Sequence, residues 1–358
     1  MLRNVAETLG FAAAGGLTLG LSGMPAGYLS GSIMAVAAAS LAGRPMLIPG
    51  PLMRVLMTLI GVSLGAVVTP ETLHGMATYP ISIAVLLLAC ACISLAGTLY
   101  LRVVHGWDTV AAYLATAPGG LSQVMAIAIE MEVDVRGVAI VQTIRVVIIA
   151  VCLPALLGLF GLGGHDTRSL GGAFNPAQLG ELAILLVVSA AAAYAAYRVR
   201  FPGGLLFGAM MASAALHGSG TIHAVMPWWV AYSVMIAFGA VTGSRFAGTP
   251  LRMMLHFVGA AFGSFATAIV IVAIFAMILV EFLSLPLAEV ILAYAPGAVD
   301  AMMLLALALN LNPVYVGAHH LMRIFFVLLT MPFVAHWTRP KKLPDPLKSP
   351  LPPPPFDD

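Results

Sequence analysis

The sequence Ala117-Pro118-Gly119-Gly120 recurs later in the chain as Ala295-Pro296-Gly297-Ala298, and in each copy an arginine, Arg145 or Arg323, follows 27 residues after the proline. The two blocks align without a gap over 38 positions at an offset of 178 residues, and 8 of these positions are identical. An internal repeat constrains an architecture more firmly than any single segment does. The repeat therefore predicts a chain made of two copies of one unit.

The composition places both copies in a membrane. Hydrophobic residues make up 61% of the chain and charged residues only 8%, whereas soluble domains devote about a quarter of their residues to charge. At roughly 20 apolar residues per span, the chain has room for about ten helices. We therefore expect an all-α polytopic membrane protein. The apolar segments lie at 5–22, 25–43, 47–68, 79–101, a broken 109–131 and 135–160, and then at 180–198, 202–217, 227–244, 254–280, a broken 286–310 and 313–337.

The path of the broken segment decides the topology. If it crosses the membrane, each copy has six spans and the copies are parallel; if it dips in and returns, each copy has five spans and the copies are inverted. With returning segments and a cytoplasmic N-terminus, 13 of the 16 Lys and Arg residues fall on the cytoplasmic side. The parallel alternative violates the positive-inside rule, because it places four arginines outside: Arg198, Arg200, Arg245 and Arg252.

The charges therefore predict two inverted repeats of about five transmembrane helices plus one re-entrant hairpin each. The expected location is the cell inner membrane, with a multi-pass chain whose N- and C-termini are cytoplasmic. The repeats should occupy residues 1–160 and 180–338, joined by a linker at 161–179. Residues 339–358 are basic and rich in proline, which predicts a disordered cytoplasmic tail.

Each hairpin should place its tip at mid-membrane. About ten residues of helix precede each Pro-Gly break, or roughly 15 Å of a ~30 Å hydrocarbon core. Pro118 blocks the helix and Gly119 with Gly120 supplies a permissive backbone for the turn, as Pro296 and Gly297 do in the second copy. Because non-helical backbone at that depth needs support from protein or a water-filled cavity, the functional site is expected there.

Arg145 and Arg323 lie about ten residues into helices that Asp134 and Asn312 are positioned to cap. A guanidinium at mid-membrane costs several kcal/mol and is normally paired or functional. Together with the N-termini of the second half-helices, the arginines predict an anion site. The alternative is a buried brace that bonds the carbonyl ends of the first half-helices or Asp300.

The two copies differ at neighbouring positions. Asp300 stands where the first copy has Ser122, and it either caps its half-helix or binds a proton or cation, which would couple Na⁺ or H⁺ to transport. Gln142 and His320 each precede an arginine by one turn on the same helix face. Either side chain belongs to the substrate site or satisfies a neighbouring carbonyl or hydroxyl.

Other classes of function lack the residues that they need. The three cysteines lie in apolar stretches and no HExxH or Cys/His cluster occurs, so we expect no metal site and no cofactor. No nucleophile–base pair is found, so an enzyme is not expected. The basic residues are scattered among loops, which argues against a nucleic-acid partner. The expected partners are the lipid bilayer and a small anionic solute, and a homodimer is compatible with the sequence.

The duplicated block, with Met24-Pro25-Ala26-Gly27 echoed by Phe201-Pro202-Gly203-Gly204, resembles the AbrB-type duplicated membrane protein family over residues 5–338. This family is also labelled as an ammonia monooxygenase, and the name AbrB implies a role in regulating gene expression. Separately, inverted repeats with re-entrant hairpins resemble the architecture of sodium-dependent carboxylate symporters, an analogy of fold only.

The sequence thus predicts an inner-membrane secondary transporter for a small anion, with a carboxylate as the expected substrate. Its site would comprise the two hairpin tips and the buried arginines. The alternative is a membrane sensor or regulator that binds a signal in the same pocket without moving it.

Overall fold

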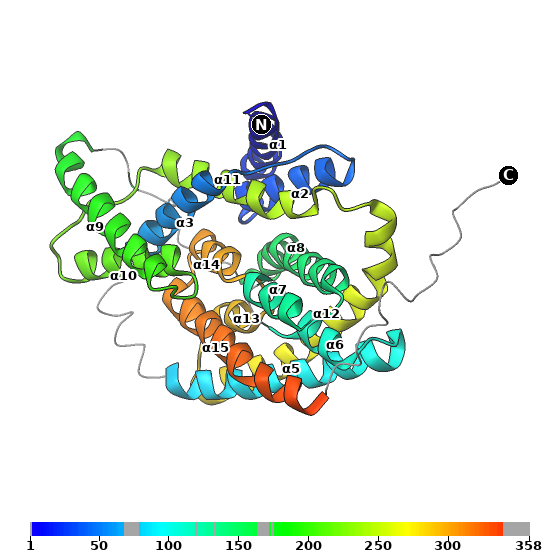
Figure 1. The fold of residues 1–358 in the computed structure, drawn as a ribbon. Helices are drawn as coiled ribbons and strands as arrows, with labels where there is room; N and C mark the ends of the chain where they lie inside the picture. Colours follow the sequence, from blue (N-terminus) through cyan, green and yellow to red (C-terminus); the bar gives the residue numbers. More distant parts are fainter. Residues whose placement is uncertain are drawn as a thin grey trace.

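The fold was obtained as a computed structural model, which describes residues 2–67, 79–118, 121–131, 133–162, 172 and 175–338. Within this part of the chain the regular structure is helical, apart from one isolated bridge between Gly172 and Pro227. The predicted linker at 161–179 and tail at 339–358 lie mostly outside the described residues. The all-α prediction is confirmed (Figure 1).

The helices recur in the same order in the two halves. The first half contains α1 (Leu2–Leu21), α2 (Gly27–Leu41), α3 (Gly50–Gly65), α5 (Tyr79–His105), α6 (Thr109–Thr116), α7 (Leu121–Glu130) and α8 (Val135–Leu159). The second contains η2 (Pro176–Gln178), α9 (Leu179–Arg198), α10 (Gly204–Gly218), α11 (Trp228–Gly243), η3 (Ser244–Phe246), α12 (Leu251–Leu283), α13 (Leu287–Tyr294), α14 (Val299–Ala308) and α15 (Pro313–Thr338). The bounds of α3, α6 and α7 reappear in α11, α13 and α14 at the offset of 178 found in the sequence.

Five of the described helices are long and apolar enough to cross a membrane: α5, α8, α9 with its preceding 3-10 turn, α12 and the 313–330 part of α15. The protein is therefore membrane-spanning in character. The helices α5 and α12 extend past the predicted apolar segments by a few residues. Hydropathy marks only the lipid-facing portion of a helix, whereas backbone hydrogen bonding continues into the polar ends.

The two halves exchange helix contacts reciprocally. Helix α2 packs against α11 of the other half, while α10, the counterpart of α2, packs against α3 (Figure 1). Glycines spaced four residues apart make both crossings close: Gly61 and Gly65 on α3 meet α10, and Gly239 and Gly243 on α11 meet α2. Small residues at this spacing let helix backbones approach each other in membranes. The two halves are thereby held as one body.

Enlarging one of these glycines should destabilise the fold. A Cβ at position 243 would lie 2.8 Å from both the carbonyl oxygen of Ile33 and the Cβ of Val36. Overpacking of this kind costs roughly 1–3 kcal/mol, so Gly243→Ala is expected to lower the thermal midpoint of the detergent-solubilised protein. Gly10→Ala is the matched control, because a Cβ there meets no atom within 4 Å. Equal midpoints for the two variants would contradict a tight α2–α11 contact.

Candidate functional site

The first broken segment folds into a hairpin beside α8. Its first arm, α6, begins near the start of α8, because a Cβ on Gly137 would lie 3.1 Å from the Trp107 ring. The same arm ends beside Arg145, whose Nη1 donates to the Thr116 carbonyl at 3.0 Å. The second arm, α7, leads back to the start of α8. Both ends of the hairpin therefore lie at one end of α8, and its tip lies near the middle of that helix.

The second broken segment has the same form beside α15. The backbone N–H of Asn312, at the start of α15, donates to the Glu289 carboxylate near the start of α13 at 3.1 Å. Deeper along α15, Arg323 Nη1 donates to the Ala295 carbonyl at the end of α13 at 2.6 Å. Helix α14 then returns to the start of α15. Both hairpins lie in the interior of the helix assembly (Figure 1).

The capping of α8 and α15 follows the sequence. The Asp134 carboxylate accepts from the backbone N–H groups of Arg136 and Gly137 at 3.0 and 3.4 Å. The Asn312 side chain accepts from those of Val314 and Tyr315 at 3.0 and 3.1 Å. These predicted caps are confirmed, and they fix the start of each arginine-bearing helix and so the depth of its arginine.

Arg145 bonds the carbonyl end of the first half-helix. Its Nη1 and Nη2 donate to the carbonyls of Thr116 and Ala117 at 3.0 and 3.3 Å, and Nη2 also donates to Gln142 Oε1. Gln142 Nε2 in turn donates to the carbonyls of Leu114 and Ala117 at 2.7 and 3.2 Å. The last carbonyls of a helix lack partners within it, and a positive charge there is favourable. Arg145, which is 4% exposed, supplies the hydrogen-bond donors for these carbonyls and also the positive charge.

Arg323 has the equivalent place in the second half. It is 2% exposed and donates from Nη1 to the carbonyls of Ala295 and Tyr294 at 2.6 and 3.5 Å. Its Nη2 lies against the ring nitrogens of His320, and His320 Nε2 lies 3.1 Å from the Leu292 carbonyl. Because the Leu292 carbonyl only accepts, Nε2 is assigned a proton, and because Nδ1 faces the Nη2 donor of Arg323, Nδ1 is assigned as the acceptor, which makes His320 neutral.

These contacts correspond to the brace that the sequence left as an alternative. The Nη groups of both arginines are occupied by backbone carbonyls and by the side chain one turn earlier, and the two positive charges repel each other. Within the described residues, the Nε of each arginine is buried without a partner. Anion binding at Arg145 and Arg323 stays a prediction, now confined to those two Nε groups.

The structure describes more residues at the tip of the second hairpin than at the tip of the first. Pro118 and Pro296 are buried, whereas Gly119, Gly120 and the side chain of Ser122 lie outside the described residues. Gly297 does not take the positive φ that would require glycine. Its lack of a side chain instead admits Met302, whose Cγ and Sδ would lie 2.8 Å from a Cβ. The sequence predicted that Gly297 is needed for an unusual backbone conformation. In the structure it is needed instead because the Met302 side chain packs directly against it.

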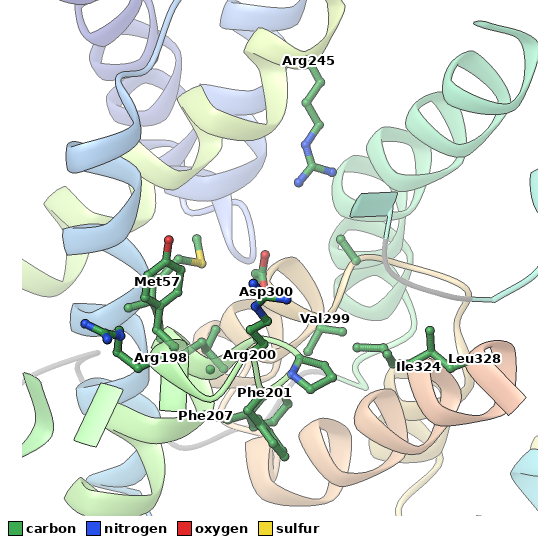
Figure 2. Close-up of a pocket in the computed structure, with 17 residues that line it drawn as sticks. Met57, Arg198, Arg200, Phe201, Phe207, Arg245, Val299, Asp300, Ile324 and Leu328 are labelled. Atoms are coloured by element: carbon green, nitrogen blue, oxygen red, sulfur yellow. The ribbon is translucent and has the colours of Figure 1, made fainter. Parts of the chain in front are cut away.

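A cavity of about 940 Å³ reaches the tip of the second hairpin. Its walls are the end of α9, the start of α10 and the chain between them, η3, and the first residues of α14, with Met57 from α3 and Ile324 and Leu328 from α15. Three arginines line it, Arg198, Arg200 and Arg245, together with one carboxylate, Asp300 (Figure 2). These charges sum to +2, so the cavity attracts anions.

Arg245 and Asp300 face each other across this space. In Figure 2 the guanidinium of Arg245 extends from η3 toward the level of Asp300. The two groups attract each other electrostatically, yet the ion pair found within 4.0 Å in the described part of the chain is Arg44 with Glu7 at 2.9 Å. The Nη1 of Arg245 is buried without a hydrogen-bond partner among the described residues. Arg245 therefore lines the cavity and carries one donor, Nη1, that the described part of the chain leaves unpaired.

Residues 28–339 match the profile of the family described as transition state regulatory protein AbrB. The chain belongs to the AbrB family. It is 24% identical over 346 residues to the protein YhjN of Bacillus subtilis strain 168, whose name assigns no function, and the match covers 90% of each chain. It is also 24% identical over 318 residues to a protein of Escherichia coli strain K12 that carries the provisional name regulator AbrB, covering 88% of this chain and 90% of that one.

The sequence of this AbrB-family chain predicted that the three cavity arginines, Arg198, Arg200 and Arg245, lie in cytoplasmic loops, and it did not indicate that they form a site. They lie at or just after the ends of α9 and α11, far in sequence from Asp300, and only the tertiary fold brings them to the hairpin tip. Asp300 was singled out, and it lines the cavity. Among the described residues no group of three His, Cys, Asp or Glu side chains is arranged to hold a metal ion.

Proposed function

We propose that this AbrB-family protein is a secondary transporter that carries a small carboxylate across the inner membrane without changing it chemically. The observation that carries the proposal is the cavity of about 940 Å³ with a net charge of +2 that ends on a hairpin tip. Ligand sites of this size and polarity hold small molecules. A tip at which two half-helices break is the place where transporters bind substrates.

The proposed topology is inverted. Each hairpin begins and ends at the same end of the helix that follows it, so it adds no crossing. The proposal takes the remaining five helices of the first half as spans: the long apolar helices α5 and α8, the 20-residue α1, and the shorter apolar helices α2 and α3 of 15 and 16 residues. An odd number of spans turns the second half over, and both termini come to lie in the cytoplasm. The distribution of 13 of the 16 basic residues on that side supports this orientation.

In this orientation the cavity opens to the cytoplasm, because the loop bearing Arg198 and Arg200 lies on that side. Arg245 is the proposed principal ligand of the carboxylate, since it lines the cavity and its Nη1 has no hydrogen-bond partner among the described residues. A guanidinium matches the two oxygens of a carboxylate. Asp300 lies on the facing side of the same cavity, where its charge weakens the attraction for anions and favours release. Alternating access would require the second hairpin to move relative to α3 and α10.

Counterflow in proteoliposomes tests the proposal. Purified protein reconstituted into vesicles preloaded with unlabelled acetate, succinate or citrate is expected to accumulate the matching labelled acid from outside. Protein-free vesicles and vesicles with heat-unfolded protein are the controls. If none of these acids is exchanged above the controls, carboxylate transport is wrong.

A second candidate function is favoured by the name of the E. coli relative, which refers to a regulator. In this reading the cavity binds a small anion as a signal and the chain does not move it. The same preparation separates the two functions. A sensor would show thermal stabilisation by one of the three acids and no counterflow, whereas a transporter would show both.

A further inference from the structure

His319 lies fully buried on α15, one residue before the bracing His320, and tyrosine rings from three helices surround it. The centroid of its ring lies 4.0 Å from that of Tyr315, 5.9 Å from that of Tyr294 on α13 and 6.1 Å from that of Tyr79 on α5. Aromatic rings at this range attract a cation through their quadrupoles. Of the three rings, those of Tyr315 and Tyr294 lie within the ~6 Å at which a ring face can attract a positive charge on the imidazole.

The hydrogen bonds of His319 can accommodate two protonation states. Nδ1 lies 2.7 Å from the Tyr315 carbonyl, which only accepts, so Nδ1 carries a proton in both states. Nε2 lies 2.7 Å from Ser82 Oγ, and this Oγ is also 3.2 Å from the Tyr79 carbonyl. In the neutral state the Ser82 hydroxyl donates to Nε2. In the protonated state Nε2–H donates to Ser82 Oγ, and the hydroxyl turns to the Tyr79 carbonyl.

The neighbouring His320 lacks this freedom. Its Nε2 donates to the Leu292 carbonyl, and its ring lies against the guanidinium of Arg323. A further proton on that ring would face a fixed positive charge and break the brace. The two adjacent histidines therefore have different chemistry: one is held neutral, and the other can gain and lose a proton without leaving a polar atom unsatisfied.

The polar groups around His319, which come from α5 and α15, have no counterparts around the first hairpin. At the offset of 178, the positions of His319, Tyr315 and Ser82 correspond to Val141, Gly137 and Ala260. The first hairpin is braced without any of these polar groups, as the contacts of Arg145 show. Bracing a hairpin therefore does not require His319 and its hydroxyl partner Ser82. A structural role common to both halves does not explain these two residues.

A chain of polar contacts runs from the start of the second hairpin to Tyr79, one of the tyrosines around His319. The Glu289 carboxylate, half-buried near the start of α13, accepts from the backbone N–H of Asn312, and Asn312 Nδ2 donates to the Tyr79 hydroxyl at 3.3 Å. The titratable or charged groups on the surrounding helices are Tyr79 and Cys90 on α5, Glu289 and Tyr294 on α13, and Tyr315, His320 and Arg323 on α15. Burial of the ring opposes protonation of His319 most, and Arg323, the fixed positive charge among these groups, opposes it further.

We propose that His319 binds the proton that drives uptake of the carboxylate, an inference that rests on the proposed function. A proton from water adds to Nε2, and the Ser82 hydroxyl turns to the Tyr79 carbonyl; release reverses both changes. The cavity reaches Ile324, the residue after Arg323. An anion bound there offsets the positive charge that opposes protonation, so anion and proton each strengthen the binding of the other.

The test measures accumulation and proton flux in the same proteoliposomes, with the membrane potential clamped at zero and sodium absent. An inward gradient of one pH unit should drive about tenfold accumulation of the exchanged acid by the wild type, since one proton per molecule transfers a tenfold gradient. A trapped pH dye should report internal acidification when the acid is added. His319→Gln should keep counterflow and lose both effects, because its amide can still bond Ser82 and the Tyr315 carbonyl.

His320→Gln is the matched control. It reproduces the Gln142–Arg145 pair of the first half and should keep proton-driven accumulation. Accumulation that persists in His319→Gln, or that requires sodium and causes no acidification in the wild type, overturns the proton site while leaving carboxylate transport intact. Absence of counterflow in the wild type overturns the proposed function itself. Size-exclusion profiles like that of the wild type establish that each variant is folded.

Discussion

Replacing Arg323 with methionine is expected to destabilise the protein more than any other single change discussed for the hairpins. The substitution removes the donors to the carbonyls of Ala295 and Tyr294 and the contact with the His320 ring. Each buried polar group left without a partner costs about 1–3 kcal/mol. No water is present in a hydrocarbon core to replace the lost donor, so the sum is a large fraction of the ~5–15 kcal/mol that holds a typical protein folded.

An opposing effect must be weighed. A buried guanidinium itself costs about 2.5–3.5 kcal/mol at the centre of a membrane helix on insertion scales, and methionine removes that cost. We expect the loss to exceed the gain, because the cost of burial has already been offset in the folded state by the carbonyls at the end of α13. Arg323→Lys keeps the charge but not the planar fork, so it should recover only part of the stability.

The equivalent change in the first half should be milder. In Arg145→Met, Gln142 still donates to the carbonyls of Leu114 and Ala117. In Arg323→Met, His320 covers only the Leu292 carbonyl, and Ala295 loses its side-chain donor. Thermal unfolding of the detergent-solubilised variants should rank wild type above Arg145→Met and Arg145→Met above Arg323→Met. Midpoints that stay at the wild-type value, with loss of anion binding, would instead favour ligation over bracing.

The sequence predicted the helices and the hairpins because their causes are local. Bilayer thickness fixes the length of an apolar span, and the prolines end their half-helices wherever the chain lies in space. The caps at Asp134 and Asn312 depend on backbone N–H groups two and three residues away. Properties of this kind can be predicted from a few neighbouring residues, and the repeat showed the Pro-Gly break and the arginine a second time.

The composition of the sites depends on contacts between distant parts of the chain and could not be predicted in the same way. Ser82 and His319 are 237 residues apart in sequence, and Arg245 and Asp300 line one cavity only because the fold brings η3 near the tip of the second hairpin. The arginines illustrate the limit. Their depth follows from the sequence, but whether a guanidinium faces a carbonyl or a solute depends on how α6 and α13 pack against α8 and α15.

Arg245→Gln is expected to weaken carboxylate binding by roughly 10- to 100-fold, since a charge-assisted hydrogen bond contributes about 1.5–3 kcal/mol and each 1.4 kcal/mol is about tenfold in affinity. The measurement is the dissociation constant of whichever acid is exchanged, obtained by titration of purified protein. Asp300→Asn should act in the opposite direction. It removes the one carboxylate that lines the cavity, so the anion should bind more tightly and leave more slowly.

Arg252→Gln is the matched control for Arg245→Gln. It shows whether a loss of affinity comes from a lost contact in the cavity or from the lower net charge of the protein. Arg252 is exposed at the start of α12 and does not line the cavity, so this variant changes the net charge by the same amount as Arg245→Gln. Interactions between exposed charges farther apart than about 10 Å are screened at 0.1 M salt, so Arg252→Gln should leave the affinity unchanged there. If Arg245→Gln behaves like Arg252→Gln, the desolvated Nη1 of Arg245 is not the ligand, and the unpartnered Nε groups of Arg145 and Arg323 become the remaining donors for an anion.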